Sequence, residues 1–294
     1  MRYATAAAFR QALEGRLRAE AAETGLSIVR LRKRVAFELL LRRLVAVAPN
    51  RWVLKGALAL DFRFPTGARS TRDMDLGRTD DEDAAVEDFA AAQELALDDY
   101  FTYAVVRTDA FDDADEFRAI RFHVTAELAA RVFEEFVVDV GFADSATWTP
   151  DEIETSDLLS FAGIERIRVP AFPLPQHLAE KVHAYTRKYG PSGRESTRPK
   201  DLVDILLIAK SESVDAAALR NAVETTFAQR EQQPLPSSLP PPPSTWEAPY
   251  RRLAEEVGVE AELDQAFAVA AAFLDPILAG RTEGEWDPQR QIWT

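Results

Sequence analysis

The chain of 294 residues contains no cysteine, which excludes disulfide bonds, thiolate metal centres and a cysteine nucleophile. It has no run of about 18 consecutive apolar residues of the kind that spans a membrane. Its first residues, Met1 to Thr5, lack the apolar core of a secretory signal. We therefore expect a soluble cytoplasmic protein with no membrane partner.

Three common active-site motifs are also missing. There is no G-x-S-x-G turn, no Walker-type phosphate loop and no G-x-G-x-x-G dinucleotide fingerprint. A serine hydrolase, a P-loop NTPase and a Rossmann dehydrogenase are therefore disfavoured.

Charge is unevenly distributed along the chain. The net charge of −14 argues against a nucleic-acid partner. Residues 1–45 nevertheless carry ten Arg and Lys against four Glu, and residues 181–200 carry six against one. Residues 73–118, in contrast, carry sixteen acidic residues against three arginines. A local basic surface could contact phosphates, and ordinary solvated helix faces explain the same pattern.

The periodicity of the first 170 residues predicts a mixed β-sheet domain with N-terminal helices. Successive strands joined by short connections favour antiparallel pairing within this sheet. The helices are expected at 5–23, 27–47, 57–62 and 80–100, and the strands at 52–54, 71–76, 103–108, 120–125, 136–142 and 167–169. The fold class is thus α+β (α/β).

Residues 171–294 form a predicted helical C-terminal domain. Its helices are expected at 175–189, 199–210, 216–229, 246–257 and 260–278. The proline-rich run 234–244 predicts a stiff extended spacer, with a proline-rich recognition ligand as the alternative. The polar tail from Gly280 is expected to fray.

The run Asp73-Met74-Asp75 carries the strongest chemical signal. In a strand, residues i and i+2 point the same way, so both carboxylates share one face and can hold hard cations such as Mg²⁺. Lys55 and Gly56 precede them by fewer than twenty residues. A lysine for phosphate charge and a glycine for close backbone approach are suited to binding a triphosphate.

Asp139 is a candidate third carboxylate, because it interrupts the apolar run Val137 to Phe142. A buried carboxylate must be paired, bound to a metal or protonated. Beside Asp73 and Asp75 it would complete a three-carboxylate metal site. The alternative is that Asp139 faces solvent on an edge strand.

A second group of charges lies in the C-terminal half. It comprises Lys181 in a predicted helix and Lys200, Asp201 and Asp204 in the first turns of the next helix, where anions are favoured. The alternative is ordinary surface charge with weak Lys–Asp pairing.

Four runs in this order resemble the motifs of AbiEii/AbiGii-type nucleotidyltransferase toxins, a group that includes the MenT toxins. The runs are Leu54-Lys55-Gly56-Ala57-Leu58, Arg69-Ser70-Thr71-Arg72-Asp73-Met74-Asp75, Glu180-Lys181-Val182-His183-Ala184 and Arg198-Pro199-Lys200-Asp201-Leu202-Val203-Asp204. The family motif has a second glycine where Ala57 stands.

The resemblance implies a nucleotidyltransferase-like fold, a type IV toxin–antitoxin system and a cognate antitoxin partner. It implies transfer of a nucleotide from an NTP, with CTP or UTP preferred, to the 3′ end of tRNA, which blocks translation. Matched by motif, Lys55, Asp73, Lys181 and Asp201 would be functional. Thr71 occupies a position that is phosphorylated in some relatives.

We expect a two-metal mechanism in which Asp73 and Asp75, with Asp139 if it faces inward, hold Mg²⁺. Lys55 and Lys181 would neutralise phosphate oxygens, and Asp201 would hold a lysine in place or orient the acceptor. The remaining candidate nucleotide-binding residues are Gly56, Arg69, Thr71, Arg187 and Lys200. Two alternatives remain open: a small-molecule or protein hydroxyl as acceptor, and a degenerate binding module without activity.

Overall fold

The computed structural model describes residues 1–108, 119–142, 148–188, 196–230 and 233–294. The chain divides into two compact units. The first comprises Met1–Thr66 and Ser70–Phe172, and the second comprises Gly67–Arg69 and Pro173–Thr294. The three-residue segment Gly67–Arg69 therefore belongs with the helical half, although it lies far from that half in sequence.

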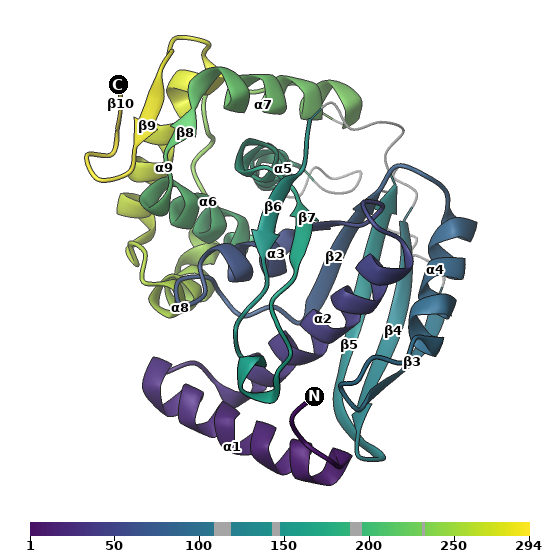
Figure 1. Cartoon of the computed structure of the whole chain (residues 1–294). Coiled ribbons are helices and arrows are strands. Elements are labelled where there is room, and N and C mark those ends of the chain that lie inside the picture. The colour runs from purple at the N-terminus through teal and green to yellow at the C-terminus, as the bar shows by residue number, and fades with distance from the viewer. Residues whose placement is uncertain (109–118, 143–147, 189–195, 231–232) are drawn as a thin grey trace. The chain divides into compact units, whose positions relative to one another are not determined.

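A mixed seven-stranded sheet forms the centre of the first unit (Figure 1). The strand order is β3-β4-β5-β2-β1-β7-β6. Strands β2 and β5 pair in parallel, as do β1 and β7, and the other neighbours are antiparallel. The strands are β1 Val53–Lys55, β2 Asp73–Arg78, β3 Phe101–Thr108, β4 Ala119–Leu128, β5 Arg131–Phe142, β6 Asp151–Glu154 and β7 Arg168–Ala171. The predicted mixed sheet is confirmed.

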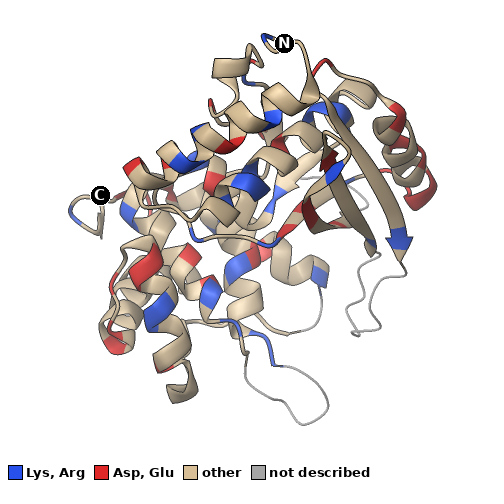
Figure 2. Cartoon of the chain, turned by 90° about the horizontal axis from the view of Figure 1, so that it is seen from below, with Lys and Arg blue, Asp and Glu red and all other residues tan. Residues whose placement is uncertain are grey.

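Three helices of the first unit begin at side-chain caps. Thr5, Ser27 and Asp81 accept hydrogen bonds from backbone amides in the first turns of α1, α2 and α4. The helices are α1 Ala6–Thr24, α2 Ile28–Val47, α3 Gly56–Arg63 and α4 Glu82–Glu94, with a short 3₁₀ turn at Ser160–Ala162. Figure 2 shows acidic residues gathered on α4.

Helix α4 is shorter than the predicted 80–100. It ends at Glu94, and the buried Arg43 of α2 then forms an ion pair of 2.8 Å with Asp99, just before β3. This pairing draws residues 98–100 away from a continued helix.

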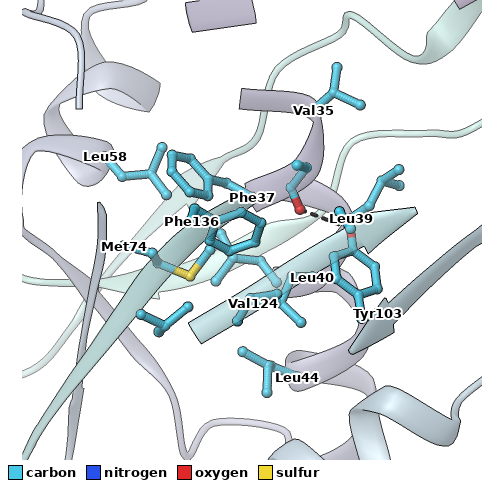
Figure 3. Packing of buried hydrophobic residues seen from close by; sticks show 14 of the residues in the cluster. Val35, Phe37, Leu39, Leu40, Leu44, Leu58, Met74, Tyr103, Val124 and Phe136 are labelled. Atoms are coloured by element: carbon cyan, nitrogen blue, oxygen red, sulfur yellow. Dashed lines mark hydrogen bonds between the residues drawn. The ribbon is translucent and has the colours of Figure 1, made fainter. Parts of the chain in front are cut away.

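The core lies between α2 and one face of the sheet (Figure 3). The rings of Phe37 and Phe136 meet edge to face, 4.8 Å apart. The Tyr103 hydroxyl donates to the Ala36 carbonyl at 2.9 Å. Met74 and Val138 are fully buried on this face. Because side chains alternate along a strand, their neighbours Asp73, Asp75 and Asp139 lie on the opposite face.

The second unit consists of helices and a small sheet of order β10-β9-β8. Its helices are α5 Leu174–Thr186, α6 Pro199–Ser211, α7 Ala216–Arg230, α8 Glu247–Val257 and α9 Leu263–Leu278, with a 3₁₀ turn at Ser244–Trp246. Its strands are β8 Val214–Asp215, β9 Glu285–Asp287 and β10 Ile292–Trp293. None of the helices in the described part of the chain is long and apolar enough to cross a membrane.

The C-terminal tail is ordered, so the expectation of a frayed tail was wrong. Trp286 is buried, and its indole N–H donates to the Ala209 carbonyl at 2.6 Å. Its ring lies against Phe273, and Trp293 stacks on the same ring. The packing of Trp286 and Trp293 therefore holds the tail against the second unit, although most of its residues are polar.

The proline-rich segment packs within the second unit, whereas the sequence predicts a spacer. Leu239 is buried, and its amide donates to Asp275 of α9 at 2.7 Å. The Tyr185 hydroxyl of α5 donates to the Pro240 carbonyl at 2.8 Å. The segment therefore links two helices of one unit.

Glu38 is a buried carboxylic acid inside the first unit. It lies on α2 and accepts hydrogen bonds from Thr155 at 3.1 Å and Ser156 at 2.6 Å. Burial raises the pKa of Glu38 from 4.5 to about 7, and the two hydroxyls offset only part of this effect. Ionising Glu38 in the folded protein therefore costs stability.

We predict that Glu38→Gln becomes stabilising as pH rises. In the unfolded chain Glu38 ionises near pH 4.5 and in the folded protein only near 7. The wild type therefore loses stability relative to the variant between these values, by roughly 3 kcal/mol in total. Urea unfolding of both proteins at pH 4.5, 6 and 8 measures this difference. A difference that stays constant across the series would contradict the assignment.

Candidate active site

Four charged residues form a row across neighbouring strands of the sheet. Lys55 on β1 pairs in register with Asp75 on β2, Asp75 with Asp139 on β5, and Asp139 with Arg121 on β4. Residues paired in register point to the same face, so the row reads +, −, −, +. Asp73 lies two residues before Asp75 on the same face. The predicted carboxylates are thus brought together, with two cations flanking them.

A glycine is required at position 56 because the Asp75 carboxylate lies against it. It begins α3 with a φ of +67°, and a Cβ placed there would lie 1.8 Å from the Asp75 carboxylate. The carboxylate therefore faces the N-terminus of α3, where backbone amides favour negative charge. Alanine at position 56 would be excluded by both the φ angle and the contact. Ala57, which follows it, is buried.

The Lys55 side chain extends over Gly141 of β5. A Cβ at Gly141 would lie 2.9 Å from the Lys55 ammonium, which is also 5.8 Å from the centre of the Phe172 ring. Within the described residues Lys55 forms no ion pair. A half-buried ammonium beside carboxylates, without a paired acid of its own, is suited to an anionic ligand.

Thr71 fixes the first carboxylate. Its hydroxyl lies 2.8 Å from Asp73 Oδ1 and 3.0 Å from the Asp73 carbonyl. Thr71 is buried. It contacts Asp73 directly, which orients the carboxylate at the start of β2.

Asp139 lies on an inner strand, β5, so the alternative of an edge strand was wrong, although its side chain is 30% exposed. Both of its oxygens accept hydrogen bonds from Arg121, from Nε and from Nη2, each at 2.7 Å. The sequence does not identify Arg121 as a site residue. The alternation of β4, in which Ile120 and Phe122 face the core, does place Arg121 on the other face.

Asp73, Asp75 and Asp139 share one face of the sheet, but they are not grouped around a common metal position. Across the ranges described above, no three acidic or histidine side chains are arranged to hold a metal together. Mg²⁺ is commonly held by one or two carboxylates together with substrate phosphates. Asp73 and Asp75 are two carboxylates on one face of β2.

A second charged group lies within the other unit. Lys181 of α5 contacts Asp204 at 2.6 Å and Asp201 at 3.2 Å, both on α6. Arg69 donates to both oxygens of Asp204 at 3.0 and 3.1 Å. Arg198 donates to Asp201 at 2.8 Å. Because Asp201 and Asp204 are fully buried, this is not the surface pairing considered from the sequence.

The pKa shifts keep this group charged. Burial alone would raise the pKa of Asp204, but Lys181 and Arg69 outweigh it and lower the value to about 2. Burial alone would lower the pKa of Lys181, but Asp204 and Asp201 outweigh it and raise the value. Lys181 is therefore a fixed positive charge at neutral pH, which favours charge neutralisation over proton abstraction.

Lys200 differs from its neighbours. It lies in the first turn of α6, and among the residues with described positions it has no carboxylate partner. Burial lowers the pKa of Lys200, and the nearby cations Arg198, Arg69 and Lys181 lower it further. Arg187 follows the last residue of α5 and is partly exposed. Residues 189–195 of the basic segment fall outside the described residues.

Comparison with known proteins decides the family. Residues 39–282 match the model of the nucleotidyl transferase AbiEii toxin of type IV toxin–antitoxin systems. The chain belongs to the AbiEii nucleotidyltransferase toxin family. No curated protein matches the chain.

Two solved structures resemble this AbiEii-family chain. MenT4, the nucleotidyltransferase toxin Rv2826c of Mycobacterium tuberculosis H37Rv, is 19% identical with a TM-score of 0.53, over 91% of this chain and 99% of MenT4. JHP933 of Helicobacter pylori is 13% identical with a TM-score of 0.47, over 88% of this chain and 94% of that one. The likeness to MenT4 supports a nucleotidyltransferase-like fold.

We predict that Gly141→Ala weakens nucleotide binding and leaves the fold intact. The new methyl group displaces the flexible end of Lys55, so stability changes by less than about 1 kcal/mol. Moving the ammonium from its place lowers NTP affinity, with an expected change of about tenfold. Calorimetric titration with each NTP and Mg²⁺ measures this. Gly15→Ala, which faces open space on α1, is the control; equal affinities in both variants would contradict the role of Lys55.

Proposed function

We propose that this AbiEii-family protein transfers a nucleotidyl group from an NTP, with CTP or UTP preferred, to the 3′ end of tRNA and thereby blocks translation. The observation that carries the proposal is the row on the sheet. Lys55, without an ion pair within the described residues, lies on the same face as Asp73 and Asp75. This combination suits a triphosphate together with a divalent cation.

In the proposed reaction the 3′-hydroxyl oxygen of the acceptor attacks the α-phosphorus of the NTP. A new phosphodiester bond forms, the bond between the α- and β-phosphates breaks, pyrophosphate leaves and the hydroxyl proton passes to solvent. Mg²⁺ bound at Asp73 and Asp75 would lower the pKa of the hydroxyl and offset the charge on the phosphates. Lys55 would neutralise phosphate oxygens, and Thr71 would hold Asp73 in its orientation.

Residues of the second unit enter the proposal through the family motifs. Lys181 would act as a permanent positive charge toward phosphate, held by Asp201 and Asp204. Arg69 supports this role by holding Asp204 from the other side. Lys200 is the stronger candidate for direct phosphate contact, because it has no carboxylate partner among the described residues. Arg187, which follows α5 and is partly exposed, is a secondary candidate for phosphate contact.

The acceptor is proposed to be the tRNA acceptor end, mainly through sequence-independent contacts with phosphates. The family resemblance supports this choice. The net charge of −14 instead favours a small-molecule or protein hydroxyl as acceptor. The site of action would be the cytoplasm, where tRNA is charged.

A cognate antitoxin is the proposed protein partner, as the toxin–antitoxin family implies. It would act by binding directly or by modifying Thr71. The Thr71 hydroxyl lies 2.8 Å from Asp73 Oδ1. A phosphate at that position would therefore bring negative charge against the carboxylate that is proposed to bind the cation.

We predict that Asp73→Ala abolishes nucleotidyl transfer without unfolding the protein. Purified protein is incubated with Mg²⁺, total tRNA and each labelled NTP separately, and label on tRNA is detected in a gel. Loss of a carboxylate from the proposed cation site should lower transfer by at least a hundredfold. Asp83→Ala removes an exposed acid of α4 and is the matched control.

The same assay separates the alternatives. Label on tRNA that decreases as salt rises supports an RNA acceptor, since phosphate contacts weaken with salt. Transfer to another acceptor, insensitive to salt, would replace tRNA by a small molecule or a protein. Absence of both transfer and NTP binding in folded protein would favour a degenerate binding module. Full activity in Asp73→Ala would contradict the site itself.

A further inference from the structure

The Arg121–Asp139 pair lies in the same row as the proposed cation site. Asp139 is directly opposite Asp75 on the neighbouring parallel strand, and Arg121 is directly opposite Asp139 on the other side. Both oxygens of Asp139 accept hydrogen bonds from Arg121 at 2.7 Å. The guanidinium is thus held as a fixed fork next to the carboxylates.

This position distinguishes the pair from an ordinary surface ion pair. The side chains of Arg121 and Asp139 are 28% and 30% exposed, on two inner strands of the sheet. Carboxylates directly opposite one another on adjacent strands repel. Arg121 neutralises Asp139. Asp75 and Asp139 can therefore lie directly opposite each other on neighbouring strands without a bound ion.

A metal-binding role for Asp139 conflicts with this geometry. Each oxygen of Asp139 already accepts a charge-assisted hydrogen bond from Arg121, so a metal ion bound at Asp139 would have to use the remaining lone pairs of these oxygens. Direct ligation would also bring a divalent cation against the guanidinium. Asp73, in contrast, accepts a hydrogen bond from the neutral Thr71 hydroxyl at 2.8 Å, and within the described residues it forms no ion pair.

We propose that Arg121 takes the place of a second protein-held cation, so that Asp73 and Asp75 bind one divalent ion and Asp139 is a positioning residue for Arg121. The guanidinium then faces the phosphates of the nucleotide as a permanent charge. This inference rests on the proposed function, and it replaces the two ions predicted from the sequence by one ion and one arginine.

The test is the stoichiometry and affinity of Mn²⁺ binding, measured by calorimetry and by electron paramagnetic resonance without NTP or acceptor. Three proteins are compared: wild type, Arg121→Gln, and Arg121→Gln combined with Asp139→Asn. The double variant has the same net charge as wild type. The control is Arg107→Gln, which removes an arginine of β3 that is bound to Glu82 of α4. Circular dichroism and urea unfolding show that each variant is folded.

We expect one Mn²⁺ per wild-type chain. Arg121→Gln frees a carboxylate beside Asp75, so the affinity should rise at least tenfold or a second ion should bind. The double variant should return to one ion, with a dissociation constant within threefold of the wild type. Arg107→Gln should match the wild type.

Three results would overturn the proposal: two ions, or none, in the wild type; a double variant that binds at least tenfold more weakly than wild type, which would make Asp139 a ligand; or no change in Arg121→Gln. Arg121→Lys provides a second test, because lysine keeps the charge without the fork. It should bind one ion with intermediate affinity. The readout requires no transfer, so the wrong acceptor or nucleotide would leave it unaffected.

Discussion

The repulsion between Asp75 and Asp139, directly opposite each other on parallel neighbouring strands, determines the surrounding design. Each carboxylate is flanked in register by a cation, Lys55 on one side and Arg121 on the other. The two cations are used differently: Arg121 is held in a two-point ion pair, whereas Lys55 lies over a glycine without an ion pair among the described residues. Arg121 therefore neutralises Asp139 at one end of the row. At the other end, the positive charge of Lys55 remains available for an anionic ligand.

In the second unit, buried aspartates are neutralised by basic side chains that lie next to them. Two aspartates of α6, Asp201 and Asp204, are fully buried with Lys181, Arg69 and Arg198 as partners. Removing one member of such a group leaves an uncompensated buried charge, which typically costs 3–5 kcal/mol. Loss of activity in variants of these residues therefore needs a parallel measurement of stability. Asp73 and Lys55, which are only half-buried, are better probes of function.

Local patterns were enough for much of the fold and for part of the site. The i, i+2 spacing placed Asp73 and Asp75 on one face of a strand, and the mixed sheet followed from the strand pattern. Pairings between distant segments were not predictable: Arg121 reaches Asp139 only through strand register, and Arg69 meets an aspartate 135 residues away. The buried Trp286 gives the tail an order that its polar composition conceals.

The central claim is that the charge of Lys55 is kept for phosphate and contributes little to the fold. The most direct measurement is urea unfolding of wild type and Lys55→Met, with and without Mg²⁺ and CTP or UTP. We expect similar stability of the two proteins without ligand, within about 1 kcal/mol. At nucleotide near 100 times its dissociation constant, wild type should gain about 2.7 kcal/mol and the variant much less. A variant that keeps the full gain, or that is several kcal/mol less stable without ligand, would contradict it.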